Sequence, residues 1–346
     1  MKKTLIAASI AALAATSANA AVKIYESETG SFSSYGKIQL ELENYDGENT
    51  IQNQGSRLGF SGDTKLDNGM TAFTNFEFRF QPGVQNNVKA AAADGGEWTV
   101  RNSYLGVKGD FGSVKAGNFD SITYTMVTEQ ADIMENLGYR SLDTGDVNSR
   151  GTAIAYETND LNGFKLGLGI KHYASKDSAY GNGTVPAAGS ILASNDGKEQ
   201  WNVEAAATFA VNDELVFGLA VDQNNKKGNP APNAAGKEAK PIFAASALYA
   251  TDAFGAGLVL ENTGDLMLAN LTGSVNYGAG DVYALVSFMD NDTTDGVDFG
   301  LGANYKMASN FKVYGEVAVG NDDLSTIQDK KGKGTTAVTV GAAYKW

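Results

Sequence analysis

The sequence contains no cysteine, one histidine and only five prolines among its 346 residues. Without cysteine the chain forms no disulfide bond, so its stability must come from packing and hydrogen bonding. A zinc site is excluded as well, because zinc sites draw on several cysteine or histidine ligands. Catalysis by the single histidine, His172, would need a positioned partner, and no motif supplies one. We therefore predict a surface position for His172, no catalytic residue, no metal site and no cofactor.

Positive charge is also scarce. The chain has 27 lysines and arginines against 40 aspartates and glutamates, which gives a net charge of −13. An acidic surface repels the phosphate backbone of nucleic acids, which basic surfaces bind. We therefore predict no nucleic-acid partner.

Long apolar runs are absent after residue 20. A membrane-spanning helix needs about 20 apolar residues, so this chain could cross a membrane only as a closed β-barrel. Residues 1–20 have the features of a secretory signal peptide: Lys2 and Lys3, an apolar stretch over 5–15, and the cleavage motif Ala18-Asn19-Ala20. We expect export, followed by cleavage that leaves one barrel domain over 21–346. Loss of Lys2 and Lys3 would change the net charge from −13 to −15.

Apolar and polar residues alternate with a period of two along most of the chain. In the clearest case Ile38, Leu40 and Leu42 alternate with charged and amide side chains. This pattern predicts β-strands with one apolar and one polar face, but it is shared by soluble sandwiches and membrane barrels.

The connections between these strands favour the barrel, because short turns alternate with long polar loops. The aromatic residues beside the short turns, such as Tyr249 and Phe254, fit an interfacial girdle. The alternation runs to Trp346, so we expect the last strand to be paired rather than frayed. The predicted strands number sixteen, in an all-β antiparallel transmembrane barrel: 33–45, 56–64, 70–80, 98–108, 113–119, 148–158, 164–175, 200–210, 215–224, 240–249, 254–263, 267–277, 282–290, 296–305, 311–320 and 335–346.

Glycine is abundant, with 41 residues, and several glycines lie inside predicted strands, among them Gly167, Gly169, Gly300 and Gly302. Glycine weakens an ordinary strand. In a barrel it eases the tight curvature of the wall and permits close packing.

Four segments resemble the trimeric general porins of Gram-negative bacteria. They are Ser34-Tyr35-Gly36-Lys37, Arg57-Leu58-Gly59-Phe60-Ser61-Gly62, the hairpin Arg101 to Val114, and Asn148-Ser149-Arg150-Gly151. The resemblance implies a homotrimer in the outer membrane, in contact with lipid and lipopolysaccharide, that passes small hydrophilic solutes. It also implies insertion by the barrel-assembly machinery through the C-terminal strand that ends at Trp346.

In that family a long third loop folds into the barrel and narrows it, with acidic side chains facing a ladder of basic ones. The resemblance places this inward-folded constriction loop at 120–147, with Asp132 and Glu135 as its acidic side. The basic ladder would be Lys37, Arg57, Arg101 and Arg150. The loop motif here is M-E-N-L-G where the family usually has P-E-F-G-G.

The distribution of arginine supports the ladder independently. All five arginines, including Arg79 and Arg140, lie within 57–150, whereas the lysines are spread over the chain. Arginine suits a crowded charged wall because it stays ionised beside other cations. With the negative net charge and acidic outer segments such as Asp290-Asn291-Asp292 and Asn321-Asp322-Asp323, this predicts a passive diffusion channel with mild cation selectivity. A substrate-specific channel and an adhesin or receptor scaffold are the alternatives.

Overall fold

The computed structural model describes residues 21–81, 97–142, 151–173, 200–223, 240–321, 325, 327–328 and 332–346. The predicted signal peptide and Arg150 lie outside these residues. None of the helices in the described part is long and apolar enough to cross a membrane.

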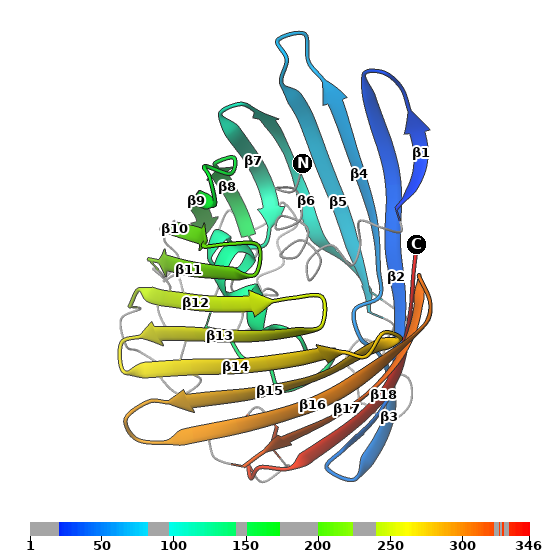
Figure 1. Ribbon diagram of the computed structural model, residues 1–346, viewed down its shortest axis with the longest axis vertical. Helices are drawn as coiled ribbons and strands as arrows, with labels where there is room; N and C mark the ends of the chain where they lie inside the picture. Colours follow the sequence, from blue (N-terminus) through cyan, green and yellow to red (C-terminus); the bar gives the residue numbers. More distant parts are fainter. Residues whose placement is uncertain are drawn as a thin grey trace, which may run out of the picture.

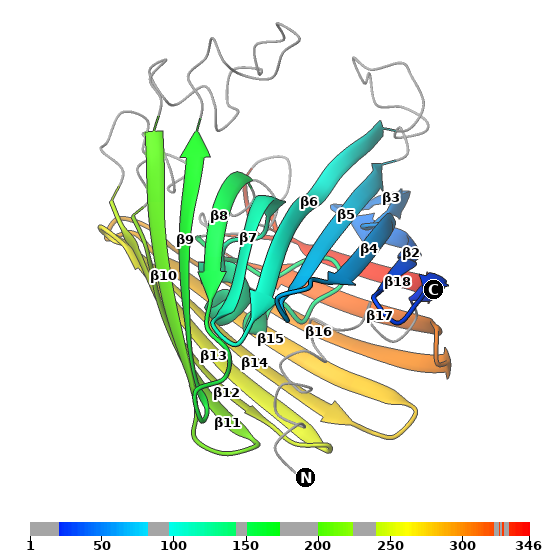
Figure 2. The same ribbon diagram turned by 90° about the horizontal axis from the view of Figure 1, so that it is seen from above.

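Eighteen strands in the described residues form one antiparallel sheet that curls into a ring (Figure 1, Figure 2). They are β1 (Val22–Glu26), β2 (Gly30–Tyr45), β3 (Glu48–Asn53), β4 (Arg57–Lys65), β5 (Thr71–Gln81), β6 (Glu97–Gly109), β7 (Gly112–Phe119), β8 (Gly151–Glu157), β9 (Phe164–Tyr173), β10 (Gln200–Ala210), β11 (Leu215–Asp222), β12 (Ile242–Ala250), β13 (Phe254–Thr263), β14 (Leu266–Asn276), β15 (Gly280–Asp290), β16 (Asp295–Ala308), β17 (Phe311–Gly320) and β18 (Thr336–Lys345).

The ring closes between the last strand and the first long one. β18 pairs with β2 from Ala337↔Tyr45 to Lys345↔Lys37. β1 pairs with β2 over residues 31–34, so β1 and β18 follow one another along the same edge of β2. On the other edge, β3 and β4 follow one another in the same way. When each collinear pair is counted as one, the wall is a sixteen-stranded antiparallel barrel, which confirms the predicted fold and strand number.

Two strands were not predicted from the sequence. β3 is largely polar and belongs to a hairpin whose turn residues, Asp46 and Gly47, both have positive φ, as a two-residue hairpin turn requires. β1 has only five residues and pairs with β2. Neither segment shows the long alternation that identifies the other strands. Each is short, because it shares one edge of β2 with a second strand.

The wall is apolar outside and polar inside. On β2, Ile38, Leu40 and Leu42 are at least half exposed, whereas Gln39 and Glu41 retain only 1% of their exposure. Other strands also expose apolar side chains and bury charged ones: Leu219 and Leu301 are exposed, whereas Glu204 and Asp298 are buried. A soluble sandwich would show the opposite arrangement. The exposed apolar face therefore assigns the alternation to a membrane barrel.

The last strand is held to its terminal residue, as predicted. Gly36 and Trp346 exchange two backbone hydrogen bonds, with N···O distances of 2.9 and 3.1 Å. The indole of Trp346 lies over Gly36, so closely that a Cβ on this glycine would come within 2.4 Å of the ring. Gly36 is thus needed where the two ends of the barrel meet.

Candidate pore constriction

The chain that follows β7 turns into the barrel instead of leaving it. Residues 120–142 contain two short helical turns, η1 (Tyr124–Thr128) and η2 (Glu129–Ala131), and Figure 1 shows their coiled ribbon inside the ring of strands. Ile122 and Val127 of this segment are fully buried against small wall residues. We call residues 120–142 the inner loop. Their position agrees with the inward-folded loop that the sequence predicts over 120–147.

Glycines in the wall make room for the inner loop. A Cβ on Gly167 would lie 2.5 Å from the Met126 sulfur and 2.6 Å from Ile122 Cγ2. A Cβ on Gly300 would lie 2.8 Å from Met134 Cε. These two strand glycines, which the sequence suggested for wall curvature, are thus needed for the close approach of the loop.

Buried carboxylates on the wall bind the inner loop through its backbone. Glu204 accepts from Thr123 N at 3.2 Å, and Glu261 accepts from the Leu142 amide and from Ser141 Oγ. Glu316 accepts from two successive amides, of Glu135 at 2.7 Å and of Asn136 at 3.0 Å. A buried carboxylate needs such donors, and a loop without regular pairing needs acceptors for its N–H groups. These glutamates therefore hold the loop in place.

Arg140 is one of these anchors rather than a residue facing water. It is only 3% exposed, and its Nε lies 2.6 Å from Asp298 Oδ2 on β16. Its carbonyl accepts from Asn270 Nδ2 at 2.8 Å. The other oxygen of Asp298 accepts from Ser325 Oγ, in the segment between β17 and β18. One wall carboxylate thus connects two inward-reaching segments.

The tip of the inner loop rests on the wall formed by β17, β18 and β2. Asn136 Nδ2 donates to Glu43 Oε1 and Thr339 Oγ1, both at 2.8 Å. Gln54, in the interruption between β3 and β4, donates to Asn136 Oδ1 at 3.1 Å. The strand break therefore provides a side chain that binds the loop tip.

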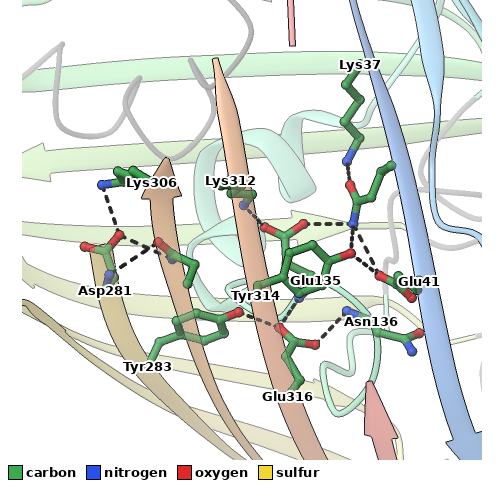
Figure 3. Close-up of polar contacts among 12 residues, drawn as sticks. Lys37, Glu41, Glu135, Asn136, Asp281, Tyr283, Lys306, Lys312, Tyr314 and Glu316 are labelled. Atoms are coloured by element: carbon green, nitrogen blue, oxygen red, sulfur yellow. Dashed lines mark hydrogen bonds and ion pairs between the residues drawn. The ribbon is translucent and has the colours of Figure 1, made fainter. Parts of the chain in front are cut away.

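Glu135 lies beside the tip, in contact with the wall (Figure 3). Its carboxylate forms an ion pair with Lys312 and accepts from Gln39 Nε2 at 3.1 Å. Burial alone would raise the pKa of Glu135, but Lys312 and Lys37 lower this pKa to about 2. The carboxylate that the sequence placed opposite the ladder is thus held by a lysine of β17, which the sequence did not single out.

The other acidic residues of the inner loop form a group of their own. Asp132 is exposed and accepts from Tyr124 OH at 2.9 Å. Burial, together with the charges of Asp120 and Asp132, raises the pKa of Glu129 to about 7. We call Asp120, Glu129 and Asp132 the acidic face of the loop. Asp120 and Glu129 were not predicted from the sequence. The inner loop has four acidic residues and one arginine, and this excess of negative charge was a signal that could have pointed to them.

The basic side of the lumen is built on β2, β4, β5 and β6. Lys37 pairs across strands with Arg57, and Arg57 with Arg79. Arg101 lies at the bulge opposite Glu77 and Phe78. The structure thus brings three of the four predicted ladder residues together and adds Arg79, while Arg150 lies outside the described residues.

A buried acid that the sequence did not reveal lies within this basic group. Glu77 Oε1 lies 3.6 Å from Arg57 and 3.4 Å from Arg101. Glu77 is only 4% exposed, whereas the two arginine side chains remain 30% and 21% exposed. The positive charges of Arg101 and Arg57 also lower the pKa of Glu129 in the inner loop, against the effect of its burial. The basic wall and the acidic face of the loop are therefore electrostatically coupled.

Comparisons with known proteins agree with this architecture. The family described as Gram-negative porin matches residues 7–346. A monosaccharide porin from a Halomonas species is 25% identical over 313 residues, which cover 84% of this chain and 80% of the relative. Among solved structures, OmpF of Salmonella typhi in complex with daunomycin has a TM-score of 0.69 at 15% identity, covering 94% of this chain and 100% of OmpF.

An anion-selective porin from Comamonas acidovorans has a TM-score of 0.65 at 18% identity, covering 92% of this chain and all of that structure. At these identities the solved structures show the fold alone, and the family match covers nearly the whole chain. The family and the fold point to a channel rather than an enzyme. The chain belongs to the Gram-negative porin family and forms an outer-membrane β-barrel for the diffusion of solutes.

Proposed function

We propose that ions and small hydrophilic solutes pass between the acidic face of the inner loop and the basic wall of β2 and β4–β6. The observation that carries this proposal is the cluster of Lys37, Arg57 and Arg79 at paired positions of the wall, with Arg101 close by, inside a barrel that the acidic inner loop enters. Opposite charges on facing walls produce a transverse field, which is strongest where the passage is narrow and its walls have low dielectric. Polar solutes align with this field, whereas apolar solutes must shed ordered water.

In this proposal Lys37, Arg57 and Arg101 line the basic side, together with Arg79, and Arg150 keeps its predicted place in the ladder. Asp132 belongs to the acidic side with Asp120 and Glu129. Glu135 holds the tip of the loop to the wall through Lys312. The loop tip therefore narrows the lumen on the β17–β18 side, and the proposed passage lies between the acidic face of the loop and the arginines.

We further propose that the channel is mildly cation-selective. The mature chain would carry a net charge of −15 after cleavage behind Ala20, and such a charge concentrates cations near the mouths of the pore. The experiment is a planar-bilayer recording in a gradient of potassium chloride. A reversal potential of the sign for potassium supports mild cation selectivity, and a chloride-selective potential overturns it.

The homotrimer, the contacts with lipid and lipopolysaccharide, and insertion by the barrel-assembly machinery through Trp346 are also proposals, supported by the family resemblance. Light scattering of the detergent-extracted protein tests the first, since a trimer has three times the mass of one chain. Conductance in groups of three steps in a bilayer is the matching electrical result.

A substrate-specific channel is the second candidate. Tyr104 lies 6.3 Å from Phe73 and 5.7 Å from Phe119, between ring centroids, on the inward-facing side of the wall, and one relative is a monosaccharide porin. Phe119 is only 3% exposed, however, so these rings pack mainly on each other. Liposome swelling separates the two candidates. Rates that follow only the size of the sugar support general diffusion, and rates that favour one sugar over others of equal size support specificity.

A further inference from the structure

Positively charged side chains follow one another across six neighbouring strands of the wall. Lys306 pairs with Lys312, and Lys345 pairs with Lys37, Lys37 with Arg57, and Arg57 with Arg79. Lys312 pairs with Ala343, which is the inward-facing residue before Lys345 on β18. We call these six residues the cationic strip: Lys306, Lys312, Lys345, Lys37, Arg57 and Arg79.

The strip faces the lumen. Lys37 alternates with the exposed Ile38, and Lys345 follows the exposed Tyr344, so both lysines share the polar inner face. Lys312 contacts Glu135 of the inner loop, and Lys306 lies 3.1 Å from Asp281 (Figure 3). A row of like charges at directly paired positions destabilises a sheet. Glu135, Asp281 and Glu77 offset part of this charge, and the remaining repulsion is a cost to the fold.

The strip runs obliquely along the barrel. Strands in such barrels are tilted by about 35–45°, so a row that follows cross-strand pairing also moves along the pore axis. Lys306 and Lys312 lie beside the short turn between β16 and β17. Arg57 and Arg79 lie at the ends of β4 and β5 that are far from their shared short turn. The strip thus leads from the mouth of the barrel at the short turns to the basic side of the constriction.

A carboxylate already occupies the middle of this strip. The Glu135 carboxylate is ion-paired with Lys312, accepts from Gln39 Nε2, and is drawn further by the charges of Lys37 and Lys345 (Figure 3). Gln39 in turn accepts from Lys37 Nζ. The donors on β2 and β17 are therefore arranged to bind a carboxylate, and here they bind one that belongs to the protein itself.

We propose that the cationic strip is a series of binding sites for small dicarboxylate solutes, and that the Glu135 carboxylate occupies the site at Lys312. This inference rests on the proposed function and deepens it by naming a class of solute. A dicarboxylate can bridge two neighbouring cations of the strip, which chloride cannot. The strip acts on these solutes, whereas the selectivity for simple salts depends on the charges of the constriction and on the net charge of the chain.

The test measures the permeability of succinate relative to chloride, from reversal potentials between potassium succinate and potassium chloride. We expect K312Q/K345Q to lower this ratio roughly threefold. The loss is modest because water and salt screen the attraction between the lysines and the solute. The charge-retaining K312R/K345R should keep the wild-type ratio. The matched control K115Q neutralises another inward-facing lysine, which lies off the strip and pairs with Glu157 at 3.1 Å.

E135Q provides an independent arm, because it removes the resident carboxylate without changing the wall. We expect it to raise the ratio of succinate to chloride permeability. The proposal is overturned by an unchanged ratio in both K312Q/K345Q and E135Q, or by an equal loss in K115Q. It is also overturned if succinate and chloride permeabilities fall together, since the strip would then attract anions of every kind. If the wild-type protein forms no conducting steps at all, the proposed function fails rather than the binding sites of the strip.

Discussion

Arg140 of the inner loop and Asp298 of β16 form an ion pair, with 2.6 Å between Nε and Oδ2 and with both side chains 2% exposed or less. The stability that a buried ion pair gives to the fold depends on the presence of both partners. Removing one of them leaves an uncompensated buried charge, which costs about 3–5 kcal/mol. Because Ser325 binds the same carboxylate, the pair also links the loop to the segment before β18.

We therefore predict that R140Q releases the inner loop while the barrel remains folded. The expected result is cleavage within 120–142 by an added protease, together with a larger and noisier single-channel conductance. The control is K23Q, which breaks the exposed Lys23–Glu26 pair of β1 and should change neither measurement. A protease-resistant loop in R140Q would show that the other anchors suffice.

Glu77 offsets the charge of the basic wall, and its removal should change selectivity. We predict that E77Q shifts the permeability ratio toward chloride, because Arg57 and Arg101 lose the carboxylate that lies within 3.6 Å of both. Reversal potentials in a potassium chloride gradient measure the shift. The control is E214Q, which neutralises an exposed glutamate beside a short turn. An equal shift in the two variants would assign the effect to net charge alone.

Glu129 should make the selectivity depend on pH. Its pKa is raised to about 7 by burial and by Asp120 and Asp132, so the acidic face of the loop loses a negative charge as the pH falls through 7. We predict that cation preference declines between pH 8 and pH 6, and that E129Q abolishes this decline. Glu135 takes no part, because its pKa of about 2 keeps it ionised throughout this range. A decline of the same size in E129Q would assign it to another group.

The same shift has a consequence for stability, with the opposite dependence on pH. A carboxyl whose pKa is raised by folding stabilises the folded state below its unfolded pKa, and this contribution is lost as the pH rises through the folded value. Protease resistance of the inner loop should therefore decrease between pH 6 and pH 8 in the wild type. It should stay constant in E129Q.

The strand glycines give a test of loop packing. We predict that G167A weakens docking of the inner loop by about 1–3 kcal/mol, because the new Cβ would overlap Met126 and Ile122. G273A is the matched control, since its Cβ would lie no nearer than 3.9 Å to another atom. Protease resistance of the loop measures both. Equal effects would indicate that wall curvature, rather than room for the loop, explains these glycines.

The alternation of side chains, combined with the regular exchange of short turns and long loops, predicted the sixteen wall positions, because the inner and outer residues of a barrel strand meet different solvents. It could not reveal β1 and β3, which share their wall positions with β18 and β4. The confinement of arginine to 57–150 pointed to Arg57 and Arg101 as members of one basic wall. The sequence could not show Glu77 between them, since that contact depends on strand register.

The partner of Glu135 was also beyond the sequence. Lys312 is 177 residues away along the chain, and the two meet only because the loop crosses the lumen to β17. Glu129 was missed for a related reason. Its burial and its neighbours Asp120 and Asp132 arise from the short helical turns of the inner loop, which no sequence period indicates.

In the proposed function, solutes pass between the acidic face of the loop and the basic wall. The measurement that tests it most directly is the reversal potential of the double variant R57Q/R101Q in a potassium chloride gradient. We predict a larger preference for potassium than in the wild type, with a folded barrel shown by unchanged heat-dependent mobility on a denaturing gel. Unchanged selectivity in the folded variant would contradict the claim, because these arginines would then lie away from the passage.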